Sequence, residues 1–172
     1  MLYPDVVLSA HRFLIGIQGE TQYSLLRYAA MAAKWHEPPR DALDTLTLGS
    51  ADLKSLAYVE QLDYMPFDPI VKRTEGTVRE NGKVFKTTKG APHVLLQLVK
   101  NKAVHRQCDK DVDALGMRGI RSLAVAKINE DGEWELLGLL TFLDPPRFDT
   151  KDTIHRAMAY GVEVRCAVFV FW

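Results

Sequence analysis

Apolar residues recur along this chain with two periods, one typical of helices and the other of strands. Helical spacing is found in Glu20–Lys34, Arg40–Leu48, Ala91–Lys100, Lys102–Met117 and Thr150–Tyr160. Strand-like runs occupy Ala57–Pro66, Lys72–Arg79, Lys83–Thr88, Ile120–Ile128 and Trp134–Leu143. The sequences Asn81-Gly82 and Asn129-Glu130-Asp131-Gly132 predict two hairpin turns. The pattern therefore predicts an α/β fold of the α+β type, with a mainly antiparallel sheet flanked by helices.

The two ends of the chain are patterned more weakly than its centre. Val6–Leu8 and Phe13–Ile17 are predicted edge strands, and Val162–Val164 is predicted to begin another strand. Asp144-Pro145-Pro146-Arg147 is a rigid exit from the last hairpin, because two prolines exclude both helix and ladder. Residues 166–172 resemble a buried strand without partners. We therefore expect a lead-in over 1–19, one domain over 20–147, and the start of a second over 148–172.

The composition indicates an ordinary soluble protein. Of 172 residues, 47% are hydrophobic, and 22 Lys and Arg balance 22 Asp and Glu. Zero formal charge provides no general attraction to nucleic acid or anionic lipid. No window contains the roughly 18 apolar residues of a membrane helix, and the N-terminus does not read as a signal peptide. Cys108 and Cys166 lack metal-ligand spacing. We expect a cytosolic chain with no membrane or nucleic-acid contact.

Residues 65–92 contain an arrangement suited to a flat ring at one end and negative charge at the other. Phe67 is predicted to lie in an exposed turn, where its ring offers a face for a purine. Lys72 follows five residues later, and Lys89 precedes Gly90 at a predicted strand end. The alternatives are a core aromatic residue, a solvated strand face and an ordinary strand-end lysine.

Two further residues lie outside this stretch. Arg121 begins an apolar strand, and its guanidinium suits forked contacts with phosphate oxygens. Asp44 and Asp41 lie on one face near the start of a predicted helix, where Asp44 is placed to accept a hydrogen bond from a base amino group. The alternatives are a salt bridge at the strand mouth and simple helix-start acids. No catalytic nucleophile–base pair, phosphate loop or metal site is recognisable.

Several of these segments together resemble a known family. The matching segments are Phe67–Thr74 (FDPIVKRT), Lys89–Pro92 (KGAP), Gly119–Ala126 (GIRSLAVA), Leu143–Arg147 (LDPPR) and the acidic helix start Pro39–Asp44. In this order they resemble the nucleotide-binding domain of P-type cation-transporting ATPases, and among these most closely the plasma-membrane proton pumps. The resemblance covers about residues 20–165.

The resemblance implies a role for each candidate residue. Phe67 would stack on adenine, and Lys89 would line the adenine end of the pocket. Lys72 and Arg121 would reach along the triphosphate, while Asp44 would lie near the adenine amino group. ATP would be bound as Mg-ATP, and residues 144–147 would match the hinge that returns to the phosphorylation domain. The implied location is the cytoplasmic face of a membrane-embedded parent.

The chain also departs from the family's pattern. It contains no DKTGT, TGD or GDGxND segment, so no acceptor aspartate or magnesium ligand is identified, and His93 stands where the family usually has glutamate. We therefore expect an ATP-binding fragment of a P-type proton-transporting ATPase that does not pump alone. Its partners would be ATP and the rest of the ATPase, if the chain is part of a longer one. The alternative is a non-catalytic regulatory or interaction protein that retains the fold, and an independent ATP hydrolase ranks last.

Overall fold

The computed structural model describes residues 7–11, 21–39, 41–143 and 148–165. For residues 7–11 the description is limited to the backbone. The described residues fall into two compact units, one within Val6–Leu143 and the other within Asp144–Trp172. The first unit contains a sheet with its covering helices, and it is the unit in which all five candidate residues lie.

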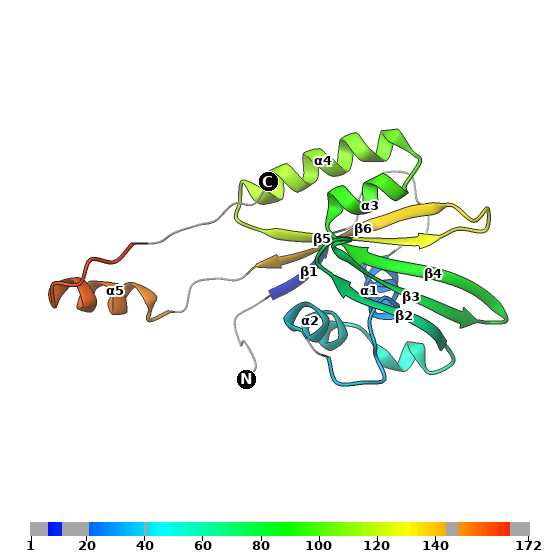
Figure 1. Ribbon diagram of the computed structural model, residues 1–172, viewed down its shortest axis with the longest axis horizontal. Coiled ribbons are helices and arrows are strands. Elements are labelled where there is room, and N and C mark those ends of the chain that lie inside the picture. Colours follow the sequence, from blue (N-terminus) through cyan, green and yellow to red (C-terminus); the bar gives the residue numbers. More distant parts are fainter. Residues whose placement is uncertain (1–6, 12–20, 40, 144–147, 166–172) are drawn as a thin grey trace. The chain divides into compact units, whose positions relative to one another are not determined.

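The larger unit is built on a six-stranded sheet of described residues, in which every pair of neighbouring strands is antiparallel (Figure 1). Its strands are β1 (Val7–His11), β2 (Glu60–Asp68), β3 (Arg73–Glu80), β4 (Lys83–Gly90), β5 (Arg121–Ile128) and β6 (Trp134–Leu143). Their order across the sheet is β1-β6-β5-β4-β3-β2. The predicted antiparallel α/β fold is therefore confirmed. The predicted edge strand at Val6–Leu8 is also confirmed, as β1, and it pairs with β6.

Helices cover both faces of this sheet. They are α1 (Gln22–Met31), α2 (Ala42–Ser50), the short 3₁₀ helix η1 (Leu53–Leu56), α3 (Pro92–Leu98) and α4 (Lys102–Gly116). Figure 1 shows α3 and α4 on one face of the sheet and α1 and α2 on the other. Three of these helices start at a capping side chain: Thr21 forms a capping box for α1, Asp41 caps α2 and Asn101 caps α4.

The core follows the period-two alternation of the central strands. On β5, Ala124 and Ala126 pack with α3 and α4, whereas Val125 between them packs against α1 residues such as Leu25 and Ala29. A third cluster joins the C-terminal half of α1 to α2, η1 and β3. Because β5 is apolar on both faces, it is buried between two helical layers.

The predicted turn at Asn81-Gly82 is confirmed. Both residues have positive φ angles, +49° and +77°, which is the backbone conformation of a type I′ hairpin turn. β3 and β4 pair in continuous register from Glu80↔Lys83 to Arg73↔Gly90. The hairpin therefore carries the residues before Gly90 to the end of the sheet opposite the turn.

Beyond residue 143, one sequence prediction is confirmed and another is wrong. The helix predicted over Thr150–Tyr160 is confirmed as α5 (Thr150–Ala159). The strand predicted at Val162–Val164 is wrong, since these residues have no regular secondary structure. A β-branched composition favours a strand only where a neighbouring strand completes the ladder. The predictions for Phe13–Ile17, Asp144–Arg147 and residues 166–172 lie outside the described residues.

We expect Gly76→Ala to lower the free energy of unfolding by about 1–3 kcal/mol, because β3 has no room for a side chain there. A Cβ atom at this position would lie 2.1 Å from the carbonyl oxygen of Met31 at the end of α1. Gly49→Ala in α2 is the matched control, since a Cβ atom there meets nothing within 4 Å. Alanine is the better helix former, so the control should gain up to about 1 kcal/mol. Urea denaturation measures both, and equal midpoints would contradict the predicted close contact.

Candidate functional site

The strand register brings the candidate residues to one end of the sheet. Asp68 pairs with Arg73, Arg73 with Gly90, and Gly90 with Ala124. β2 and β4 therefore end where β3 and β5 begin. Phe67, Lys89 and Arg121 come from three separate strands, yet this register places all three at the same end.

Two cavities open at this end. The smaller, of about 230 Å³, is lined by Asp41, Ala42, Leu43, Asp44, Phe67, Thr74, Lys89, Gly90 and Leu123. The larger, of about 340 Å³, is lined by Lys34, Glu37, Pro38, Pro39, Asp41, Asp44, Tyr64, Pro66 and Phe67. Asp41, Asp44 and Phe67 line both. The structure thus brings together three of the five predicted residues, Phe67, Asp44 and Lys89, around adjoining cavities.

Lys89 is almost completely buried, with an exposed fraction of 3%. Its ammonium lies 2.7 Å from Oδ1 of Asp44, and it donates hydrogen bonds to the carbonyl oxygen of Ala32 (2.9 Å) and to Oγ1 of Thr74 (3.1 Å). Burial lowers the pKa of Lys89 from its ordinary value of 10.5, while the carboxylates of Asp44 and Asp41 act in the opposite direction. Lys89 lies at the end of a strand, as predicted, but its side chain is buried and not exposed to solvent.

The C-terminal end of α1 explains why a lysine is tolerated there. The last carbonyl groups of a helix lack intrahelical partners and carry partial negative charge. Ala32 is the C-cap of α1, and its carbonyl accepts hydrogen bonds from both Lys89 and Thr74 (2.6 Å). One turn earlier, Thr87 donates to the carbonyl of Tyr28 (2.9 Å). Side chains of β3 and β4 therefore complete the end of the helix.

The N-terminal end of α2 supplies the carboxylates. Asp41 is the N-cap, and its Oδ1 accepts a hydrogen bond from the backbone N–H of Asp44 (2.7 Å). Asp44 is in the first turn, where the helix dipole favours negative charge. Both residues are thus helix-start acids, as the sequence indicated. Asp44 additionally forms the buried ion pair with Lys89, and it remains on the wall of both cavities.

Phe67 has an exposed fraction of 57%, so its ring is open to a ligand. The prediction that it lies in a turn is wrong, because β2 continues to Asp68. The flanking prolines, Pro66 and Pro69, suggested an earlier strand end. However, the pairing of β2 with β3 shifts register between Met65 and Asp68, and this irregularity accommodates Pro66 and Phe67 within the strand.

The two remaining predicted residues, Lys72 and Arg121, lie outside the lining of both cavities. Lys72 is in the turn between β2 and β3, with a positive φ of +48°. Arg121 is the exposed first residue of β5, as the sequence indicated. Since side chains two apart on a strand share a face, Arg121 is on the same face of the sheet as Leu123, which lines the smaller cavity.

Sequence reasoning missed Thr74 and the carbonyl of Ala32, both of which bind Lys89. Thr74, Gly76 and Val78 are all buried and alternate along β3 with less buried residues. A threonine in the buried phase of an alternating strand is a signal for a buried hydrogen bond, and that signal was present. A backbone carbonyl at a helix end leaves no comparable sign in the sequence.

The described part of the chain gives no indication of a metal site or a membrane span. It contains no group of three or more His, Cys, Asp and Glu side chains placed to hold a metal ion. None of its helices is long and apolar enough to cross a bilayer. The residues that line the two cavities supply an aromatic face, carboxylates and ammonium groups.

Comparison with known proteins identifies several relatives. The chain is 52% identical over 151 residues to probable proton ATPases 1A and 1B of Leishmania donovani, a match that covers 86% of this chain and 16% of each relative. It is 33% identical over 159 residues to the putative cation-transporting ATPase MJ1226 of Methanocaldococcus jannaschii, covering 88% of this chain and 19% of that protein. No family model matches the chain. The chain thus spans less than a fifth of the length of these relatives.

We expect Lys89→Met to lower the free energy of unfolding by about 3–5 kcal/mol, because it leaves the Asp44 carboxylate buried without its cation. The double variant Asp44→Leu/Lys89→Met should lose less than the sum of its two single variants. Urea denaturation of the original protein, the two single variants and the double variant gives the coupling free energy between Asp44 and Lys89. Glu37→Gln is the matched control, since the more exposed pair of Lys34 and Glu37 should contribute about 0–1 kcal/mol. Additive single changes at Asp44 and Lys89 would show that the two charges are not coupled.

Proposed function

The chain belongs to the family of P-type cation-transporting ATPases, and on this premise we propose that residues 20–147 bind ATP for an ATPase of which this chain forms a segment. The single observation that supports the proposal best is the meeting of two cavities at Phe67 and Asp44, beside the buried ammonium of Lys89. An exposed aromatic face next to a fixed carboxylate suits a purine that carries an amino group.

The adenine would stack on Phe67, whose ring is more than half exposed. Asp44 would accept a hydrogen bond from the amino group of the base. Its carboxylate is held in place by the ammonium of Lys89 and by the cap of α2. Because the position of the carboxylate is fixed before a ligand arrives, binding would lose little further conformational entropy there. Lys89 would line the adenine end of the site, where its ammonium would add positive electrostatic potential.

The triphosphate would extend toward Lys72 and Arg121. Both side chains are exposed and lie at the same end of the sheet as Phe67, but outside the two cavities. Their place beyond the cavity walls is consistent with a ligand longer than a base. Magnesium would enter as Mg-ATP, neutralising charge on the phosphates, and residues of this chain would make no direct contact with it.

In the complete ATPase this segment would present the γ-phosphoryl group to an aspartate elsewhere in the protein. Two of the relatives are named as proton ATPases and the third as a cation-transporting ATPase. We propose the proton as the transported ion, since the relatives with the higher identity are named for it. The segment would lie on the cytoplasmic face, where ATP is present, and its partner would be the remainder of the ATPase.

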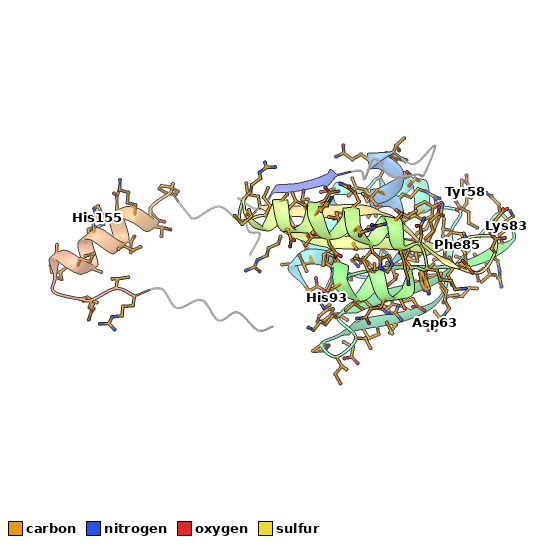
Figure 2. All side chains as sticks on the ribbon, turned by 90° about the horizontal axis from the view of Figure 1, so that it is seen from above. Tyr58, Asp63, Lys83, Phe85, His93 and His155 are labelled. Carbon is orange, nitrogen blue, oxygen red and sulfur yellow. The ribbon has the colours of Figure 1, made fainter. Side chains whose placement is uncertain are left out.

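Phe67→Ala should weaken ATP binding about ten-fold or more, because base–aromatic stacking contributes about 1–3 kcal/mol. Amide chemical shifts followed during titration with Mg-ATP measure the affinity, which we expect to be about millimolar for an isolated domain. Tyr58→Ala is the matched control, since Tyr58 is a highly exposed aromatic residue outside both cavities. Figure 2 shows Tyr58 toward the end of the sheet that carries Lys83, away from His93. If no amide near Phe67 or Lys89 shifts at millimolar Mg-ATP, the proposed function is wrong.

Inosine triphosphate should bind about ten-fold more weakly than ATP, because its base has a carbonyl oxygen where adenine has an amino group. That oxygen would face the carboxylate of Asp44, which would then receive no hydrogen bond from the base. The two ligands have the same triphosphate, so the difference isolates recognition of the base. Inorganic tripolyphosphate serves as the control ligand and should cause no shift near Phe67. Equal affinities for the two nucleotides would remove Asp44 from the proposed contact with the base.

A further inference from the structure

A close backbone contact joins the end of β4 to the turn between β2 and β3. At Gly90, a Cβ atom would lie 2.5 Å from the carbonyl oxygen of Lys72 and 2.5 Å from Cβ of Arg73. Real Cβ atoms essentially never approach other heavy atoms this closely. Gly90 has no positive φ angle to explain its presence. Its lack of a side chain is therefore required by the neighbouring turn and not by its own backbone conformation.

The turn that approaches Gly90 is held in one shape by its own hydrogen bonds. Oδ1 of Asp68 accepts a hydrogen bond from the N–H of Ile70 (2.7 Å), and the carbonyl of Asp68 accepts one from the N–H of Lys72 (2.7 Å). Lys72 then adopts a left-handed conformation with φ of +48°. This conformation is uncommon for residues with a side chain other than asparagine or aspartate, and for β-branched residues it is a clear outlier.

The left-handed residue turns its carbonyl group toward β4. The carbonyl oxygen of Lys72 accepts a hydrogen bond from the N–H of Ala91 at 3.0 Å, directly after Gly90. We use the term main-chain latch for the Lys72 carbonyl, the bare Cα of Gly90 and the Ala91 N–H. These backbone groups therefore fasten together two segments whose residues Lys72 and Gly90 are 18 positions apart in the sequence.

The latch lies between two residues of the candidate site. On one side, Phe67 immediately precedes the turn that begins at Asp68. On the other side, Lys89 immediately precedes Gly90 and holds Asp44 in its ion pair. The latch therefore joins the segment that carries Phe67 to the strand whose Lys89 holds the carboxylate of Asp44.

We propose that Lys72 and Gly90 are positioning residues, which set the distance between the aromatic face and the carboxylate through the main-chain latch. The inference rests on the proposed binding of ATP. It assigns to Lys72 a contribution through its backbone conformation, in addition to any contact of its ammonium with phosphate. The two contributions are separable, because adenosine has the base but no phosphate.

Two neutral substitutions at one position test this proposal. Lys72→Asn and Lys72→Thr both remove the ammonium, but asparagine accepts the left-handed conformation and β-branched threonine does not. We expect Lys72→Asn to bind adenosine as tightly as the original protein, and Lys72→Thr to bind it about ten-fold more weakly. Both variants should lose the same part of the preference for ATP over adenosine. Amide shift titrations with adenosine and with Mg-ATP provide all of these affinities.

Hydrogen exchange of the Ala91 amide reports on the latch without any ligand. The amide should be protected in the original protein and in Lys72→Asn, and should exchange faster in Lys72→Thr and in Gly90→Ala. Gly90→Ala should also weaken the binding of adenosine and of ATP by the same factor, because it displaces the residues that bind the base and not those that bind the phosphates. If Gly90→Ala fails to fold, the two variants at position 72 still test whether the latch positions the base site.

The outcomes separate the latch from the proposed function. Equal adenosine affinities for Lys72→Asn and Lys72→Thr would overturn the latch, because the two variants differ in how well they accept the left-handed conformation and both lack the ammonium. If the original protein binds neither adenosine nor Mg-ATP, the proposed function fails first and the positioning role falls with it. Different Ala91 exchange in the two variants would then still establish the latch as a structural device only.

Discussion

The buried ammonium of Lys89 is the constraint on which the arrangement of the larger unit depends. A charge removed from water is strongly destabilising unless partners satisfy it. The partners of Lys89 come from three elements: the Ala32 carbonyl at the end of α1, Asp44 in the first turn of α2, and Thr74 on β3. The end of one helix, the start of the next and two strands must therefore converge on one point. The cavities at this end of the sheet are bounded by the same elements.

Close contact with α1 fixes this convergence. Gly76 leaves room on β3 for the carbonyl of Met31, and Thr74 and Lys89 bond to the carbonyl of Ala32. An ammonium has three donors, and those of Lys89 have three acceptors within the protein. The lysine would have to release one of them to donate to a ligand. In the proposed complex its effect on the base would therefore be exerted mainly through its charge and through the position it gives to Asp44, and Phe67 and Asp44 would make the direct contacts with the base.

Much of the fold could be predicted from the sequence because the signals are local. Asn81-Gly82 specified a hairpin, period-two and helical spacing located the strands and helices, and Asp41 and Asp44 were placed near the start of the helix that is α2. The burial of Lys89 could not be predicted, because it depends on a helix end that is 57 residues distant in the chain. The position of Phe67 within β2 was missed for a different reason: two prolines indicated a strand end, and the register shift that tolerates them is a property of the pairing with β3. The conformation of Lys72 was also hidden, since lysine gives no sign of a left-handed turn.

The charges around the cavities favour one orientation of the proposed ligand. Lys89 is paired with Asp44, and Lys34 is paired with Glu37 at 2.8 Å, so the cations that line the cavities are already matched by carboxylates. Asp41 adds a further negative charge to the wall of both cavities. Phosphate groups placed inside would face net negative charge, whereas an amino group would be attracted. Lys72 and Arg121 lie outside the cavities, at the same end of the sheet. A nucleotide bound with its base between Phe67 and Asp44 would place a hydrogen-bond donor at the carboxylate and its phosphates toward the two cations, whereas the reversed orientation would place the phosphates beside carboxylates.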